Sequence, residues 1–166
     1  MDLIKGDITT LDLDCIVNAA NENLMPGGGV CGAIHEAAGK ELAVECKRIG
    51  HCGVGEARIT SGYDLKAKHV IHTVGPIWHG GNHGEDQYLF NCYKKSLLLS
   101  THHGIESIAF PNISTGIYGY PKESAAETAI AAVKQHQRSG RKLKEVIFCC
   151  FDEENFQLYD KLLNKD

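Results

Sequence analysis

Short apolar runs alternate with amphipathic segments along the chain, and this alternation predicts strands that are separated by helices. Runs of branched and aromatic residues, such as Val70-Ile71 and Val146-Ile147-Phe148, are typical of strands that are buried on both faces of a sheet. The N-terminus is also strand-like before Gly6. Further strands are predicted over residues 13–18, 57–61, 69–74, 107–111 and 145–151.

Between these strands, apolar residues recur at the spacing of one helix face. Helices are predicted over residues 30–48, 85–102, 123–137 and 153–164. The third has small residues, including Ala125 and Ala129, on the face that would approach a sheet, with Pro121 before it and Gly140 after it. Alternating strands and helices predict an α/β fold built in layers.

Composition narrows the class of protein. The 166 residues are enough for one domain with a sizeable core, and we expect a single domain over residues 1–166. Apolar residues make up 43% and charged residues 23%, which is typical of a soluble globular protein. The net charge is −4 and no polybasic run occurs, so nucleic acid is not an expected partner. A phosphate ligand would have to be held by backbone amides.

The cysteines and the absence of long apolar segments bear on the compartment. The sequence shows neither the apolar core of a secretory signal nor an apolar run of membrane-spanning length. Seven cysteines are an odd number and are scattered, which favours free thiols in a reducing environment. We therefore expect a cytoplasmic monomer that does not bind membranes.

A run of three glycines, Gly27-Gly28-Gly29, leads directly into a predicted helix that begins at Val30. Glycine lets a ligand approach the backbone closely, and the free amides of a helix N-terminus favour an anion. The spacing matches neither the Walker A motif nor the dinucleotide-binding fingerprint. A long flexible turn is the alternative, but the direct entry into a helix favours a phosphate-binding loop.

A second loop of this kind follows the strand at 107–111. Its hydroxyl and amide groups would face a phosphate, and Tyr118 would offer a flat wall to a sugar. The alternative is a turn whose tyrosines pack as surface anchors. The candidate residues of this loop are Ser114, Thr115, Gly116, Ile117 and Tyr118.

Polar residues stand at the ends of the first two strands, where ligands of open α/β sheets bind. Asp7 offers a carboxylate to an exocyclic amine such as that of adenine. The residues alone favour a simpler interpretation, in which Asp7 caps local backbone in a Gly-Asp turn. Asn18 and Asn21 suit ribose hydroxyls, although asparagines at a strand end are also common in turns.

Cysteine and histidine residues gather between positions 31 and 52 but lack zinc-binding spacing, so we expect no metal and no cofactor. Cys31 lies in the first helical turn beside the glycine loop. A nucleophile needs a base and an orienting partner, and neither is evident here, so a covalent cysteine mechanism is not expected.

Five segments in order resemble the macrodomain family, and specifically its MacroD-type branch of ADP-ribose hydrolases. The segment GEARITSGYDLKAKHVIHTVGP at 55–76 is the longest match. The family's zinc-containing branch carries an insertion near the glycine loop, for which this chain has no room. The other matching segments are 6–9, 16–21, 27–39 and 110–121.

The resemblance implies a three-layer α/β/α sandwich around a mixed sheet, with ADP-ribose, free or on a modified protein, in a cleft at the strand ends. Asp7 and the backbone of Ile8 would bind adenine, and Phe151 would pack on or beside the ring. The loop from Ser114 to Tyr118 would hold the diphosphate. The distal ribose would contact Asn21, Gly28, Gly29 and Val30, with Tyr118 at its border.

The resemblance further implies hydrolysis at C1″ of the distal ribose, with Asn21, Cys31 and Tyr118 as the candidate catalytic residues. Family hydrolases often carry Asp where this chain has Cys31, which lacks a carboxylate for activating water. Loss of one general base costs about two to four orders of magnitude, so we expect a slower enzyme. The alternative is a module that binds ADP-ribose without turning it over.

Overall fold

Six strands form one mixed sheet in the computed structural model, which describes residues 1–141 and 143–165. The order across the sheet is β1-β6-β5-β2-β4-β3, and the β3–β4 pair alone among these is antiparallel. The expected α/β fold with a mixed sheet is confirmed. The strands are β1 (Asp2–Lys5), β2 (Cys15–Ala19), β3 (Ala57–Ser61), β4 (His69–Thr73), β5 (Ser107–Phe110) and β6 (Glu145–Cys150).

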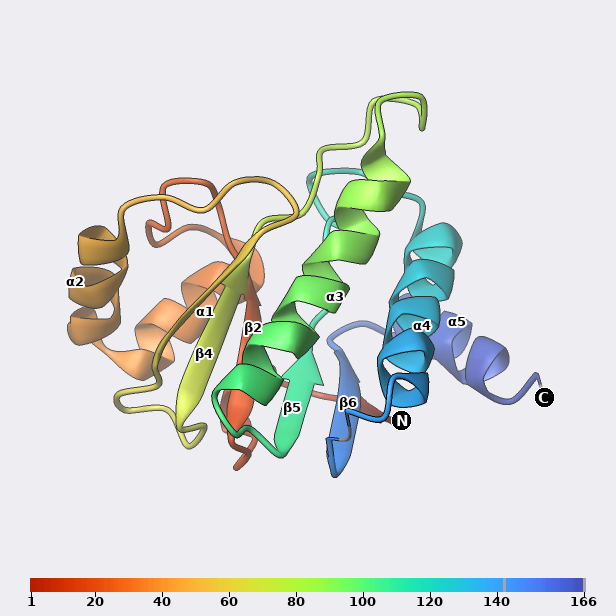
Figure 1. Cartoon of the computed structure of the whole chain (residues 1–166). Coiled ribbons are helices and arrows are strands. Elements are labelled where there is room, and N and C mark those ends of the chain that lie inside the picture. The colour runs from red at the N-terminus through yellow and green to blue at the C-terminus, as the bar shows by residue number, and fades with distance from the viewer. Residues whose placement is uncertain (142, 166) are drawn as a thin grey trace.

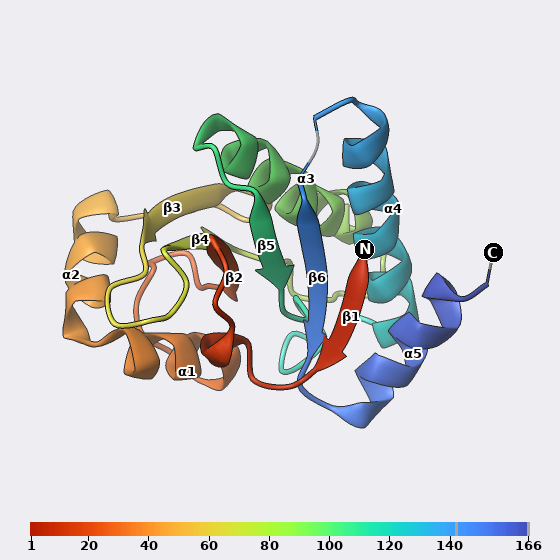
Figure 2. The same cartoon turned by 90° about the horizontal axis from the view of Figure 1, so that it is seen from below.

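Helices cover both faces of the sheet and complete the three layers (Figure 1 and Figure 2). One face carries α1 and α2, and the other carries α3, α4 and α5. Successive strand residues alternate between the two cores: Ile16 packs with the α1 and α2 side, and Val17 packs with the opposite side. The helices are α1 (Gly29–Ala38), α2 (Lys40–Ile49), α3 (Glu85–His102), α4 (Lys122–Arg138) and α5 (Glu153–Leu163).

The segment expected to form one helix over 30–48 contains two helices that are separated by Gly39. Gly39 has a φ of 87°, and its N–H donates to the carbonyl oxygen of His35, which ends α1. A Cβ at this position would lie 2.8 Å from a carboxylate oxygen of Asp64. The single-helix prediction was wrong because apolar positions continue at helical spacing across the break, from Ile34 on α1 to Leu42 on α2.

The parallel strands all point their carboxyl ends at the same edge of the sheet, so the loops that follow them meet there. These loops begin at Gly6, Ala20, Val74, Pro111 and Phe151. The last strand ends at Cys150, which leaves Phe151 in the loop rather than in the strand as expected. Among the described residues, no helix is both long and apolar enough to cross a bilayer.

Candidate functional site

A cavity of about 690 Å³, here called the main cavity, lies at the carboxyl ends of the parallel strands. Every ligand-binding candidate from the sequence lines it except Asn18. Its lining residues come from loops that are far apart in the sequence. One group comes from the loops after β1 and β6, and another comes from the loops after β2 and β5. The candidates brought together are Asp7, Ile8, Asn21, Gly28, Gly29, Val30, Cys31, Ser114, Thr115, Gly116, Ile117, Tyr118 and Phe151.

The glycine loop presents bare backbone to the main cavity. Gly28 is the N-cap of α1 and supplies no side-chain hydrogen bond, and Gly29 adopts a left-handed φ of 56°. A Cβ on Gly32 would clash with the carbonyl oxygen of Gly27, so the absence of a side chain there lets the loop fold tightly onto α1. Within the described residues, no acceptor pairs with the N–H groups of Gly28, Gly29 or Val30.

The loop after β5 presents a second row of amides. Ser114 takes a left-handed φ of 66°, which is strained for a residue with a side chain, and its carbonyl oxygen accepts from the N–H of Tyr120 at 2.9 Å. In the described part of the chain, the N–H groups of residues 115–118 have no acceptor. A loop whose amides are left unpaired in this way is suited to binding an anion.

The Asn21 side chain is held by hydrogen bonds within its own loop. Its Oδ1 accepts from the N–H of Met25 at 3.0 Å, and its Nδ2 donates to the carbonyl oxygen of Met25 at 2.8 Å. The turn interpretation therefore describes the local geometry. The amide still has a second N–H and a second lone pair, and the residue lines the main cavity, so it retains the capacity to bind a ligand.

The structure does not bring Asn18 into the main cavity, because β2 continues through it to Ala19 and its side chain faces the interior on the α1 side. Asn18 Nδ2 lies 3.7 Å from the Sγ atom of Cys31 and 3.1 Å from Nδ1 of His72, and Oδ1 has no partner within the described residues. Asn18 thus lies behind the cavity wall that Cys31 forms.

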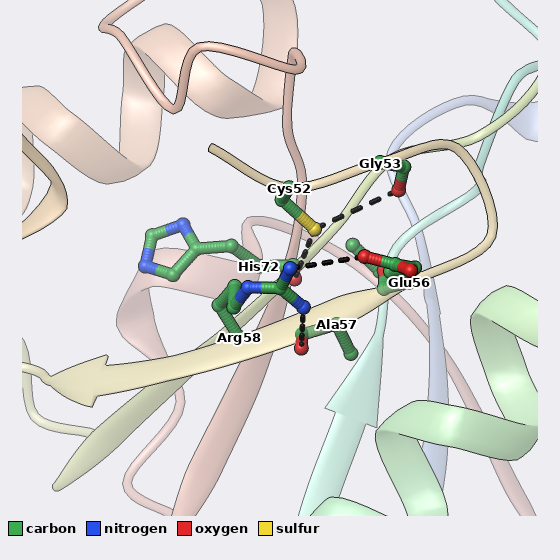
Figure 3. Close-up of polar contacts among 7 residues, drawn as sticks. Cys52, Gly53, Glu56, Ala57, Arg58 and His72 are labelled. Atoms are coloured by element: carbon green, nitrogen blue, oxygen red, sulfur yellow. Dashed lines mark hydrogen bonds and ion pairs between the residues drawn. The ribbon is translucent and has the colours of Figure 1, made fainter. Parts of the chain in front are cut away.

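His72 completes this buried polar cluster. Burial, aided by the nearby His35, lowers the pKa of His72 to about 3, so the ring is neutral at physiological pH. Its Nε2 lies 2.9 Å from Oγ1 of Thr60. The thiol of Cys52 contacts the backbone carbonyl oxygen of His72 and not its ring (Figure 3).

Asp7 performs the backbone cap that the sequence favoured. Its Oδ1 accepts from the N–H and the hydroxyl of Thr9, at 2.9 and 2.7 Å, and so begins the short 3-10 helix Ile8–Thr10. Within the described residues both of these bonds end on Oδ1, so Oδ2 is free to accept from a ligand. Phe151, 81% exposed, stands at the same end of the main cavity. An aromatic ring left this bare is suited to stacking against a flat ligand.

Sequence reasoning missed several residues that line the main cavity, among them Gly75 and Lys122. A Cβ on Gly75 would clash with Oγ of Ser114, so this glycine makes room for the strained loop. Lys122 pairs with Glu154 at 2.6 Å. A lysine in the first turn of α4 is unfavourable because its charge opposes the helix dipole. This unfavourable position was the feature of the sequence that could have marked Lys122 as a functional candidate. Among the described residues, no three potential metal ligands gather into a site.

Comparison with known proteins gives the family. The Macro domain family model matches residues 17–129. A Cronobacter turicensis protein named O-acetyl-ADP-ribose deacetylase is 53% identical over 99% of this chain and 96% of its own length. The Xenopus laevis ADP-ribose glycohydrolase MACROD2 is 53% identical over 97% of this chain and 39% of its own. The Trypanosoma brucei macrodomain in complex with ADP-ribose aligns with a TM-score of 0.92 and 40% identity, covering 98% and 68% of the two chains. The chain therefore belongs to the Macro domain family.

Proposed function

We propose that this protein binds ADP-ribose in the main cavity and hydrolyses derivatives that are joined to C1″ of the distal ribose. The observation that carries the proposal is the presence of two separate rows of unpaired backbone amides, at 28–30 and 115–118, in one cavity. Such amides can hold a diphosphate without a cluster of basic side chains, which fits a chain with a net charge of −4.

The other lining residues indicate which end of ADP-ribose would lie at which end of the main cavity. Asp7 and Phe151 would take the adenine, and Asn21 and Tyr118 would take the distal ribose, with the diphosphate between them. The relative solved with ADP-ribose supports this ligand, and the hydrolase names of the two curated relatives support turnover.

The substrates would be mono-ADP-ribosylated acidic side chains, O-acetyl-ADP-ribose or ADP-ribose-1″-phosphate. In the reaction, the oxygen of water bonds to C1″ as the bond from C1″ to the leaving oxygen breaks. The leaving group keeps the electron pair, and the proton of water passes to a phosphate oxygen of the substrate. Asn21 and Tyr118 would position the ribose, which preserves much of the rate even without a protein base.

A second function, binding of ADP-ribose without turnover, is favoured by the positions of the carboxylates that line the main cavity. Among the described residues, the carboxylates that line the main cavity are Asp7 and Asp152, and both come from the loops at the Phe151 end. The ribose end has Cys31, a thiol that is only 5% exposed, where a carboxylate would be needed to activate water.

Release of ADP-ribose from a protein modified on glutamate distinguishes the two functions. A hydrolase releases ADP-ribose above the spontaneous rate, and the Asn21→Ala variant releases it more slowly. A module that only binds gives no release while it retains tight binding of ADP-ribose by calorimetry, and this outcome would contradict the hydrolase proposal.

We also propose that the protein works as a monomer in the cytoplasm. The seven cysteines, all described and all free, support a reducing compartment. Analytical ultracentrifugation tests the monomer, and imaging of the tagged protein in the cell tests the compartment.

A further inference from the structure

A second cavity of about 380 Å³, here called the side cavity, adjoins the ribose end of the main cavity. Gly75 and Tyr118 line both cavities, so the two cavities are adjacent and these residues lie between them. Neither Asp7 nor Phe151, at the adenine end, lines the side cavity. The side cavity therefore lies where a group attached to the distal ribose would leave the main cavity.

The walls of the side cavity are mostly apolar. Ile77 is 50% exposed and Tyr88 is 45% exposed, and each leaves apolar surface open to a partner. The polar groups at the opening are the imidazoles of His79 and His83 and the exposed carboxylate of Glu22. The apolar residues that complete the walls are Val74 and Pro76, which are buried, and Val54, which is partly buried.

One wall is held in place by a buried carboxylate. The Glu85 side chain accepts from the N–H groups of His79, Gly81 and His83 at 2.8, 3.0 and 2.7 Å. Burial opposes the charge, but these backbone hydrogen bonds outweigh it and lower the pKa of Glu85 to about 2, so the carboxylate stays ionised. The loop between β4 and α3, which projects from the body of the protein in Figure 1, is thus fixed to the start of α3 by these hydrogen bonds.

The same loop is joined to the phosphate-binding loop. The N–H of Trp78 donates to the carbonyl oxygen of Tyr118 at 2.8 Å, and the Trp78 ring packs on Tyr120 with centroids 4.8 Å apart. At Val74, which lines the side cavity, the carbonyl oxygen accepts from the N–H of Gly55 at 2.8 Å. The next residue in sequence, Glu56, forms the ion pair with Arg58 that Figure 3 shows. Contacts within the protein itself therefore hold these walls of the side cavity in place.

We propose that the side cavity binds the polypeptide that carries the ADP-ribose, and specifically an apolar side chain beside the modified acidic residue. This proposal rests on ADP-ribose occupying the main cavity as set out above. Ile77 and Tyr88 provide the apolar contact, and the two imidazoles can hydrogen-bond the peptide backbone. An acidic neighbour is disfavoured because it would face Glu22.

The test uses three ligands: free ADP-ribose, and two peptides that carry ADP-ribose on one glutamate through a linkage that water does not cleave. One peptide has Leu on both sides of the modified residue, and the other has Asp. The wild type is compared with Ile77→Ser and with the matched control Val44→Ser, because Val44 is also 50% exposed but lies on α2 and lines neither cavity. Calorimetry gives the dissociation constants.

The Leu peptide should bind the wild type about tenfold more tightly than free ADP-ribose does, as expected for one apolar side chain in a pocket. Ile77→Ser should lose this advantage while its affinity for free ADP-ribose stays unchanged, and Val44→Ser should keep both. Equal affinity of the wild type for both peptides and for free ADP-ribose would overturn the proposal. A wild type that binds the Leu peptide preferentially but cleaves no ester-linked substrate would support the side cavity and count against hydrolysis alone.

Discussion

The Sγ atom of Cys31 lies 3.7 Å from the amide nitrogen of Asn18, in a contact that is buried behind the wall of the main cavity. The thiol also lies 3.6 Å from the carbonyl oxygen of Met25, to which it can donate. Asn18 in turn reaches His72, whose ring is neutral. Within the described residues the thiol therefore has neutral polar neighbours and no base that would make it a nucleophile.

This contact makes the Cys31→Asp variant informative. A carboxylate at position 31 would accept from the Asn18 amide and would stand at the ribose end, where the described residues that line the main cavity offer no other carboxylate or imidazole. Release of ADP-ribose from a glutamate-modified protein should rise about 100-fold, which is the lower range for general base catalysis. The Cys31→Ser control keeps the size of the side chain and should show no gain. A Cys31→Asp rate equal to that of the wild type would show that water is activated elsewhere.

Replacement of Asp7 tests the adenine end. Asp7→Ala removes a charged acceptor and should weaken ADP-ribose binding by about 1.5–3 kcal/mol. Because Asp7 also caps the 3-10 helix, the Asp7→Asn variant is the control: its amide oxygen can keep the bond to Thr9. Calorimetry with ADP-ribose, ADP and AMP should show the same loss for all three ligands, since each contains adenine. Unchanged affinity in both variants would remove Asp7 from the binding site.

Gly75 tests whether the shape of the phosphate-binding loop is required. An added Cβ would clash with Oγ of Ser114 and lie 2.6 Å from Cγ2 of Ile113. Gly75→Ala should therefore displace the strained loop, destabilise the protein by about 1–3 kcal/mol and weaken ADP-ribose binding. In the matched Gly53→Ala variant the nearest neighbour lies 3.4 Å away, and thermal unfolding and calorimetry should both match the wild type. Normal ADP-ribose affinity in Gly75→Ala would show that the loop tolerates movement.

The order of strands and helices followed from the sequence because strands buried on both faces, such as Val146-Ile147-Phe148, are apolar without interruption. The break at Gly39 did not, because the buried face continues from one helix to the next. The burial of Asn18 was not evident from the sequence, because a polar residue near a strand end has the same pattern whether it faces a ligand or the interior. The side cavity was not predicted because Glu85 at a helix start indicates only a favourable dipole interaction. The sequence gives no sign that the preceding loop folds back and donates the N–H groups of His79 and Gly81 to this carboxylate.

The buried ring of His72 makes stability depend on pH. Its pKa falls from an ordinary value of 6.5 in the unfolded chain to about 3 in the folded protein, chiefly through burial. Above pH 6.5 the ring is neutral in both states, so no stability is lost. Below pH 6.5 His72 binds a proton in the unfolded chain but stays neutral in the folded protein. The free energy of unfolding therefore falls until the pH reaches about 3. The slope from this one group approaches about 1.4 kcal/mol per pH unit.

The His72→Gln variant separates the contribution of His72 to the pH dependence of stability from that of the other histidines. Burial also lowers the pKa of His35 and His136, so the wild type carries contributions from several rings. Glutamine does not titrate, and its amide can still reach Thr60, so the variant should fold with lower stability at pH 7.5 and with a shallower loss towards pH 4.5. Urea unfolding at several pH values measures both quantities. Parallel pH profiles for variant and wild type would mean that His72 is protonated inside the folded protein, and that the polar cluster behind Cys31 carries a charge.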